Sequence, residues 1–218
     1  MAEFVIASKL SSCLESSSNH VTLKSVKDVR PPIILASGSP RRRDLLAGLN
    51  LDFEVIPADV DESALPNEAP AALVERLSLL KGSAVADAHF DALVIAADTV
   101  VVLDDDILGK PVDHAENERF IRRLAGRKHE VYTGHALLYR EGLEKSVQRT
   151  EVHFRDLTDD EIAAYVATGE GLDKAGGYAI QGYGAALIPH IVGDYFNVVG
   201  LSVATVVSHA ARLGVRLV

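Results

Sequence analysis

The chain has 218 residues, of which 48% are hydrophobic, so it can bury the core of one domain of about 200 residues. Its net charge of −9 and pI near 5.3 argue against a protein that coats nucleic acid, because such proteins need a broad basic surface. A few cations in one cleft would still suffice for a small phosphorylated ligand. The single cysteine, Cys13, favours a reducing compartment, and no apolar run reaches the roughly 18 residues of a membrane-spanning helix.

Residues 1–30 differ in composition from the rest of the chain. They are rich in serine, and their longest apolar run, at 4–7, is too short for the core of a signal peptide. They also carry acidic residues and no arginine before Arg30, which is a poor match to a mitochondrial transit peptide. We expect a flexible N-terminal extension over 1–30, followed by a single domain over 31–218.

From residue 32 onward the hydrophobic pattern predicts strands and helices in alternation. A short buried strand at 33–36 leads into a helix that starts at Ser39-Pro40, because serine is a favoured N-cap and proline a favoured first helical residue. The spacing of apolar residues predicts the elements that follow. These are strands at 53–56, 92–97 with a continuation at 100–103, 130–140, 146–155 and two within 185–199, and helices at 70–88, 114–125, 158–168 and 202–213. This order indicates one integrated α/β fold.

The turn between the first strand and the first helix is the first candidate site. Ser37 and Ser39 offer hydroxyl groups beside the free N–H groups of a helix N-terminus, which suits a phosphate group. Arg41, Arg42 and Arg43 follow, and one or two of them could grip phosphate oxygens in a bidentate way. The alternative is a well-capped helix with a solvated basic first turn. We favour phosphate binding because three cations there oppose the helix dipole unless an anion lies near.

Two carboxylates follow predicted strands. Asp98 is placed at the carboxyl end of an apolar strand, where ligands gather in open α/β sheets, and Glu62 comes just after another strand. Together they could hold Mg²⁺ or orient water, whereas alone Asp98 could cap a turn and Glu62 could belong to a solvated loop. Lys81 interrupts an apolar helical stripe, and Lys110 lies between glycine and proline. Each lysine is either a ligand of an anion or a surface residue whose stem lies on apolar neighbours.

A glycine-rich segment at 173–184 predicts a loop whose backbone comes close to a ligand. Within it, the Gln181 amide has the donors and the acceptor needed to read the edge of a base. A tight, ordered loop without a ligand is the alternative. The sequence lacks the motifs of P-loop nucleotide hydrolases, zinc proteases, serine hydrolases and paired-cysteine metal sites. These absences leave metal chemistry on phosphates, through oxygen ligands, as the class that fits.

Taken together, these segments resemble the Maf family of nucleotide pyrophosphatases, the homologues of a septum-formation protein. The resemblance covers residues 32–215 and is specific because the order and approximate spacing of many short motifs agree. In one-letter code they are LASGSPRR at 35–42, DE at 61–62, K at 81, ADTVV at 97–101, LGKP at 108–111, LAG at 124–126, DKAG at 173–176, IQG at 180–182 and VGL at 199–201. Ser202 stands where the family commonly has proline, and Leu80 where it frequently has glutamate.

The resemblance implies an elongated α/β fold, in which a mixed β-sheet and two lobes surround a central substrate cleft, similar to inosine triphosphatase. It implies a cytoplasmic enzyme, often a homodimer, that depends on Mg²⁺ or Mn²⁺ and cleaves a nucleoside triphosphate to the monophosphate and pyrophosphate. The expected partner is a small nucleotide, and neither a nucleic acid polymer nor a membrane is expected to bind.

The resemblance also implies roles for single residues. Asp98 corresponds to the family's catalytic proton acceptor, and Glu62 and Asp98 are expected to hold the metal. The expected phosphate ligands are Ser37, Arg42, Lys81, Lys110 and, from its place at the helix start, Ser39. Three positions match the subgroup that acts on dTTP and UTP, namely Arg41, Thr99 and Gln181.

Other functions stay open from the sequence alone. One is a pyrophosphatase for 7-methyl-GTP or other noncanonical nucleotides, and another is a nucleotidyltransferase, which also pairs a basic loop with strand-end carboxylates. A third is a non-catalytic nucleotide sensor that regulates cell division. The acidic residues speak against pure triphosphate binding, because carboxylates repel phosphate unless a metal intervenes.

Overall fold

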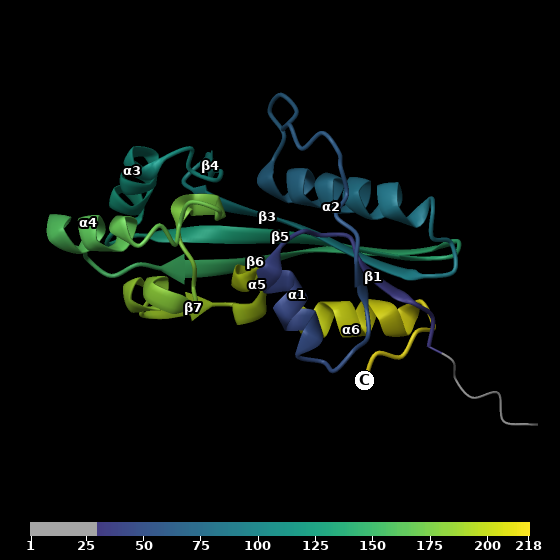
Figure 1. The fold of residues 1–218 in the computed structure, drawn as a ribbon. Helices are drawn as coiled ribbons and strands as arrows, with labels where there is room; N and C mark the ends of the chain where they lie inside the picture. The colour runs from purple at the N-terminus through teal and green to yellow at the C-terminus, as the bar shows by residue number, and fades with distance from the viewer. Residues whose placement is uncertain (1–29) are drawn as a thin grey trace, which may run out of the picture.

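The computed structural model describes residues 30–218, whose fold is drawn in Figure 1. The expected extension over 1–30 therefore lies, apart from Arg30, outside the described residues, and the domain boundary stays a prediction. A seven-stranded sheet forms the centre, with the order β2-β1-β3-β5-β6-β7 and with β4 paired to β3. Its strands are β1 (Ile33–Leu35), β2 (Glu54–Val55), β3 (Leu93–Leu103), β4 (Asp106–Leu108), β5 (Lys128–Tyr139), β6 (Gly142–His153) and β7 (His190–Val192).

Helices cover both faces of this sheet. They are α1 (Pro40–Ala47), α2 (Pro70–Ala86), α3 (His114–Leu124), α4 (Asp159–Ala167), α5 (Tyr195–Val199) and α6 (Val203–Arg212), with the 3-10 helices η1 (Ala175–Gly177) and η2 (Gly182–Leu187). In Figure 1, α2 lies on one face of the sheet and α1 and α6 lie on the other, while α3 and α4 gather at the opposite end. None of the helices within 30–218 combines the length and the apolar character that crossing a membrane requires.

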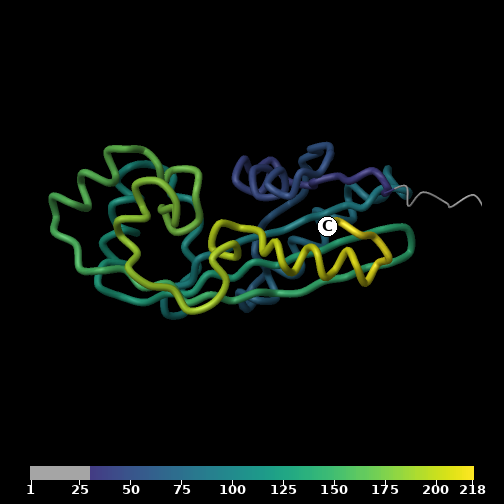
Figure 2. The backbone as a smooth tube through the Cα atoms, turned by 90° about the horizontal axis from the view of Figure 1, so that it is seen from below, coloured from purple at the N-terminus to yellow at the C-terminus, as the bar shows by residue number. Residues whose placement is uncertain are grey.

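The expected fold class is confirmed: the sheet is mixed, and the molecule is elongated. β1 runs parallel to β2 and β3, and every other strand pair in the sheet is antiparallel. The long strands β3, β5 and β6 run through both halves of the molecule, and this gives it the extended outline seen in Figures 1 and 2. One sheet therefore carries the side chains of both halves.

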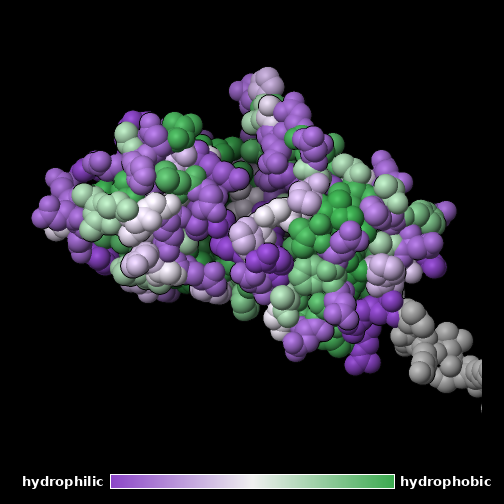
Figure 3. Space-filling model, viewed as in Figure 1, coloured by the Kyte–Doolittle hydropathy of each residue, from purple (hydrophilic) through white to green (hydrophobic). Residues whose placement is uncertain are grey.

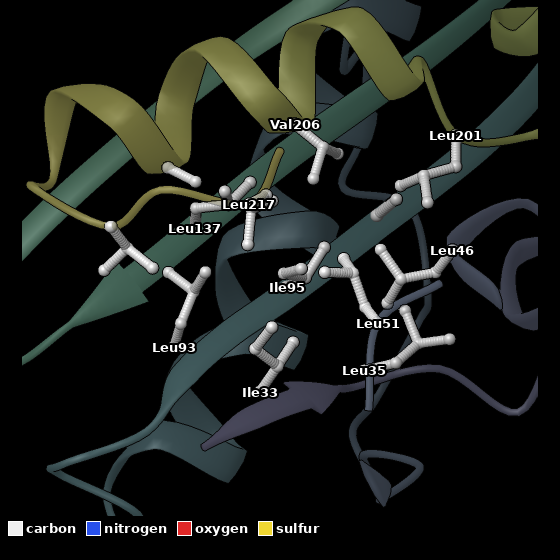
Figure 4. Close-up of a cluster of buried hydrophobic side chains, with 13 residues drawn as sticks. Ile33, Leu35, Leu46, Leu51, Leu93, Ile95, Leu137, Leu201, Val206 and Leu217 are labelled. Atoms are coloured by element: carbon white, nitrogen blue, oxygen red, sulfur yellow. The ribbon is translucent and has the colours of Figure 1, made fainter. Parts of the chain in front are cut away.

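Side chains along β3 alternate between the two faces of the sheet, and each set joins a different core. Leu93 and Ile95 belong to the cluster that packs β1 and β3 against α1 and α6 (Figure 4). Val100 and Val102 face the other way and pack against apolar side chains of α2. Val101 joins a further cluster with α3 and α4. These cores fix α1, α2 and both ends of β3 relative to one another, and they thereby position the site.

The sequence signals for helix ends are confirmed where the side chains act as caps. The Ser39 hydroxyl accepts a hydrogen bond from the backbone N–H of Arg42 at the start of α1. Thr158 and Glu161 form the reciprocal capping box that opens α4. Gly126, with φ of 68°, follows the end of α3 in the left-handed conformation that glycine adopts most readily.

The prediction of two strands within 185–199 is wrong for its second half. β7 is the one strand within this segment; η2 ends at Leu187 before it, and α5 follows it over Tyr195–Val199. The Asp194 carboxylate accepts a hydrogen bond from the Phe196 N–H at 2.8 Å, which caps a helical turn. Asn197 is fully buried and donates to the Val131 carbonyl at 3.1 Å. Apolar residues at strand-like spacing therefore form a short helix because polar side chains fix its start and its contact with the sheet.

Candidate active site

The edge of β3 that faces β1 has a gap in its strand pairing. β1 pairs with β3 as far as Ile95, and β4 pairs with the same edge only from Val101 onward. Between them, within the described chain, residues 96–100 of β3 have a strand partner only on their other side, in β5. A cavity of about 750 Å³ opens at this gap. Hydrophilic residues gather along the indentation between the two halves (Figure 3).

All of the site residues predicted from the sequence line this one cavity. They are Ser37, Ser39, Arg41, Arg42, Glu62, Lys81, Asp98, Thr99, Lys110 and Gln181. They come from the β1–α1 turn, the first turn of α1, the loop before α2, α2 itself, β3, the segment after β4 and the loop between η1 and η2. The fold thus brings together segments that are far apart in the sequence, while the role of each residue stays a prediction.

The position predicted for Asp98, at the end of its strand, is wrong. Asp98 lies in the middle of β3, which continues to Leu103 because β4 and β5 pair with its second half. The strand that does end at the cavity is β1, whose last residue, Leu35, pairs with Ile95. The carboxyl end of β1, the kind of position where ligands gather in parallel sheets, therefore opens onto the cavity, and Asp98 lines the cavity just beyond that end.

Lys81 links the two predicted metal-binding carboxylates. Its Nζ lies 2.7 Å from Asp98 Oδ1 and 2.7 Å from Glu62 Oε2. The Lys81 and Asp98 side chains are only 11% and 10% exposed, whereas that of Glu62 is 56% exposed. Lys81 reaches Asp98 because both side chains lie between α2 and the sheet. The ammonium thus stands between two carboxylates at the floor of the cavity.

The carboxylate oxygens of Asp98 and Glu62 fit a divalent cation that takes its other ligands from a bound phosphate group and from water. Asp98 and Glu62 each contact Lys81 through one oxygen, which leaves a second oxygen on each carboxylate. Residues 30–218 contain no cluster of three or more His, Cys, Asp or Glu side chains that could hold a metal without other ligands. Mg²⁺ commonly binds through one or two carboxylates and substrate phosphates, and keeps several waters. Two carboxylates beside a turn that is predicted to bind phosphate match this pattern.

Arg42 is buried and forms hydrogen bonds across the centre of the site. Its Nε donates to the Gly200 carbonyl at 2.8 Å, and one terminal nitrogen donates to the Ala97 carbonyl at 2.8 Å and to Ser37 Oγ at 3.1 Å. The other terminal nitrogen donates to Thr99 Oγ1 at 3.0 Å. Burial lowers the pKa of Arg42, and the nearby Asp98 charge opposes this shift. Of the five guanidinium N–H donors, one is left for a ligand, so the predicted bidentate grip on phosphate does not match this geometry.

The hydroxyl of Ser37 keeps a free donor. Ser37 is buried, and its Oγ accepts from Arg42 and, at 3.3 Å, from the backbone N–H of Ser39. A hydroxyl that accepts two hydrogen bonds still has its own hydrogen to donate. Lys110 is exposed at the cavity rim and has no hydrogen bond or ion pair with residues 30–218. Both groups can therefore donate to an incoming phosphate.

Thr99 faces the opposite side of β3 from Asp98, as strand alternation requires. Its hydroxyl accepts from Arg42 and lies 3.0 Å from Thr133 Oγ1. Thr133 in turn donates to the Asn197 carbonyl at 3.0 Å. The Thr99 side chain therefore uses its hydroxyl within the protein, and it anchors Arg42.

Sequence reasoning assigned no role to several residues that build the site. Thr133 is fully buried in the sheet and supports Thr99, yet a threonine within an apolar strand carries no sequence signal. Gly200 supplies a carbonyl to Arg42, and its φ of 121° suits glycine. Asp173 lies 3.5 Å from Arg41 across the cavity. Its place in the DKAG motif was a signal that could have found it.

Residues 32–213 match the family model described as Maf-like protein. A protein of Bacillus cytotoxicus named dTTP/UTP pyrophosphatase is 51% identical over 80% of this chain and 91% of its own length. A protein of Deinococcus radiodurans with the same name is 48% identical over 86% of this chain and 96% of its own. A HAM1 protein structure from Coxiella burnetii gives a TM-score of 0.46 at 14% identity, over 72% of this chain and 80% of that one. This chain belongs to the Maf-like protein family.

Proposed function

We propose that this protein is a nucleoside triphosphate pyrophosphatase that hydrolyses dTTP and UTP to the monophosphate and pyrophosphate. The observation that carries the proposal is a single cavity in which hydroxyl and cationic donors stand beside two carboxylates. The names of the relatives from Bacillus cytotoxicus and Deinococcus radiodurans support the same reaction and substrates. The matches span 91% and 96% of the two relatives' own lengths, so the likeness concerns nearly the whole of those proteins.

The triphosphate is proposed to bind at the β1–α1 turn. Ser37 can donate its free hydroxyl hydrogen, and the N-terminus of α1 adds partly unpaired N–H groups and the positive end of a helix dipole. Lys110 can reach a phosphate oxygen from the rim. Arg42 contributes its positive charge and one N–H, while its other hydrogen bonds hold the turn against β3.

Asp98 is the proposed proton acceptor. A water molecule attacks the α-phosphorus, the bond from this phosphorus to the bridging oxygen breaks, and pyrophosphate leaves. The water gives its proton to the Asp98 carboxylate, which Lys81 holds in place by donating to Oδ1. We place the expected Mg²⁺ or Mn²⁺ at Asp98 and Glu62, where it would neutralise charge on the phosphates. Most of the rate enhancement then comes from positioning and charge stabilisation.

Gln181 is the proposed reader of the base. Its amide can donate to a pyrimidine carbonyl and accept from N3–H, and its side chain is exposed to the cavity. A mismatch in a desolvated site costs on the order of 1–3 kcal/mol, which corresponds to roughly tenfold to hundredfold discrimination against CTP. A cytoplasmic location and a homodimer stay predictions.

Phosphorus NMR of UTP with the purified protein tests the reaction. We expect UMP and pyrophosphate with Mg²⁺, and no turnover in EDTA. Release of orthophosphate and UDP, or full activity in EDTA, would overturn the mechanism. Transfer of the nucleotidyl group to an acceptor, without free monophosphate, would indicate a nucleotidyltransferase. Values of kcat/KM for dTTP, UTP, CTP, ITP and 7-methyl-GTP then test the selectivity. A preference for ITP or 7-methyl-GTP would contradict the proposed selectivity for dTTP and UTP.

A further inference from the structure

The backbone that follows Gln181 is held by a carboxylate from another part of the chain. Glu170 Oε1 accepts from the Tyr183 N–H at 2.9 Å, and Oε2 accepts from the Gly184 N–H at 2.9 Å. These two N–H groups lie in the first turn of η2, whose N-cap residue is Gln181 itself. The Gln181 side chain makes no capping hydrogen bond. Glu170 therefore caps this turn in its place and leaves the amide free to face the cavity.

Gly182 is shaped to this carboxylate. Its φ is 68°, and a Cβ built on it would lie 2.1 Å from Glu170 Oε1. Any other residue at this position would displace the carboxylate or strain the backbone. The glycine after Gln181 thus permits the close approach of Glu170, and it is not simply a flexible link.

The main chain of Glu170 is linked to Arg41, through Lys174 and Asp173, by hydrogen bonds and an ion pair. Its carbonyl accepts from Lys174 Nζ at 2.5 Å, and the same ammonium donates to Asp173 Oδ1 at 2.6 Å. Asp173 Oδ2 lies 3.5 Å from Arg41. Burial works against it, but Lys174 and Arg41 hold the pKa of Asp173 below its ordinary value, so this carboxylate is charged at neutral pH. Two of the three expected specificity residues, Arg41 and Gln181, are thereby connected through one short segment.

We propose that Glu170 is a positioning residue for base selection. It holds the backbone next to Gln181, so that the Gln181 amide stays where it can bond to the edge of the base, and it does not itself touch the nucleotide. The inference rests on the proposed pyrophosphatase activity. Hydrogen bonds from backbone N–H groups to a carboxylate are charge-assisted and stronger than neutral ones. Loss of both frees the turn that carries Gln181, so the amide samples several positions and the difference in binding between bases shrinks.

The test compares Glu170→Ala and Glu170→Gln with Glu118→Ala. Glu118 is an exposed carboxylate on α3 that pairs with Arg122, so its removal deletes the same charge without touching the Gln181 loop. The measurements are kcat and KM for dTTP, UTP and CTP. We expect Glu170→Ala to lower the ratio of kcat/KM for dTTP over CTP at least tenfold, mainly through KM for dTTP, with kcat within about threefold of wild type. Glu170→Gln keeps one acceptor oxygen, so its ratio of kcat/KM for dTTP over CTP should lie between those of Glu170→Ala and wild type. The ratio for Glu118→Ala should match wild type.

A double-mutant cycle separates positioning from general support of the fold. In the Gln181→Ala background, removal of Glu170 should change the ratio of dTTP to CTP less than twofold, because the group that Glu170 positions is gone. If Glu170→Ala lowers activity on all three nucleotides equally, or adds its full effect in the Gln181→Ala background, the inference is wrong. Should Glu170→Ala fail to fold, the same comparison is made with Glu170→Gln. A wild-type protein that hydrolyses none of them would contradict the proposed function instead.

Discussion

Lys81 Nζ lies 2.7 Å from Asp98 Oδ1 at the floor of the cavity. Both side chains are almost fully buried, so this ion pair is largely shielded from water. It orients the Asp98 carboxylate, which β3 presents beyond the end of β1. The proposed chemistry therefore depends on an aspartate that is held by a lysine from α2.

Replacement of this aspartate separates chemistry from structure. Asp98→Asn keeps an oxygen that can accept from Lys81, so the fold is expected to survive, but a neutral amide cannot take a proton. We expect kcat to fall by about 10²-fold or more, in line with the loss of a general base. Steady-state kinetics with UTP and a thermal melt measure the two effects. A rate above about a tenth of wild type, a barrier change under ~1.4 kcal/mol, would remove Asp98 from this role.

Removal of the lysine should increase metal binding by the nucleotide-free protein while it lowers turnover. In Lys81→Met, Asp98 and Glu62 lose the ammonium that neutralises them, so their two charges attract a divalent cation more strongly. We expect the Kd for Mn²⁺ to fall about tenfold, which is about 1.4 kcal/mol. Titration followed by electron paramagnetic resonance measures it, with Lys145→Met on the surface as the control. An unchanged Kd would contradict a shared site for the ammonium and the metal.

Sequence patterns predicted which residues come together at the site better than they predicted the hydrogen bonds between those residues. Motifs placed Asp98, Lys81 and the β1–α1 turn near one ligand, and the cavity contains all of them. They did not reveal that most N–H groups of Arg42 donate to other parts of the protein, because the acceptors include the backbone carbonyls of Ala97 and Gly200. Partners more than fifty residues apart in the chain become neighbours only through the tertiary fold.

The fold itself was predictable where local signals agree with packing. Strand and helix patterns and the capping residues at Ser39 and Thr158 located most elements. The segment at 195–199 was misjudged because its apolar residues fit a strand equally well. Its helical form is fixed by Asp194 and by the contact of Asn197 with β5, and neither follows from periodicity.

Arg42 should not tolerate lysine, although the charge is kept. A lysine ammonium cannot replace the planar guanidinium, which donates to Gly200, Ala97 and Thr99 at once. The buried carbonyls of Gly200 and Ala97 therefore lose their donors. We expect Arg42→Lys to lower the free energy of unfolding by about 3 kcal/mol. Urea unfolding measures this, with the exposed neighbour Arg43→Lys as the control, for which a change within about 0.5 kcal/mol is expected. A stability equal to wild type would show that the fork is dispensable.

The stability of the fold should fall as the pH drops below 6.5. His129 and His135 are buried on β5, and burial lowers the pKa of each from 6.5 to about 3. Between these values the unfolded chain takes up a proton on each histidine, while the folded protein does not. Their contribution to stability is therefore complete above pH 6.5 and is lost as the pH falls toward 3. Each histidine accounts for about 1.4 kcal/mol per pH unit in this window.

Urea unfolding at pH 7.5 and pH 5 measures this loss, which we expect to be about 2 kcal/mol for each histidine. Carboxylates do not interfere, because a group such as Glu130, whose pKa is held near 2 by Arg149, loses its contribution only below its ordinary value of 4.5. His129→Phe removes one titrating group, and it also deprives Tyr178 of a hydrogen-bond partner at every pH. The variant should therefore be less stable at pH 7.5 but lose about 2 kcal/mol less between the two pH values. An equal loss in variant and wild type would mean that folding does not shift the pKa of His129.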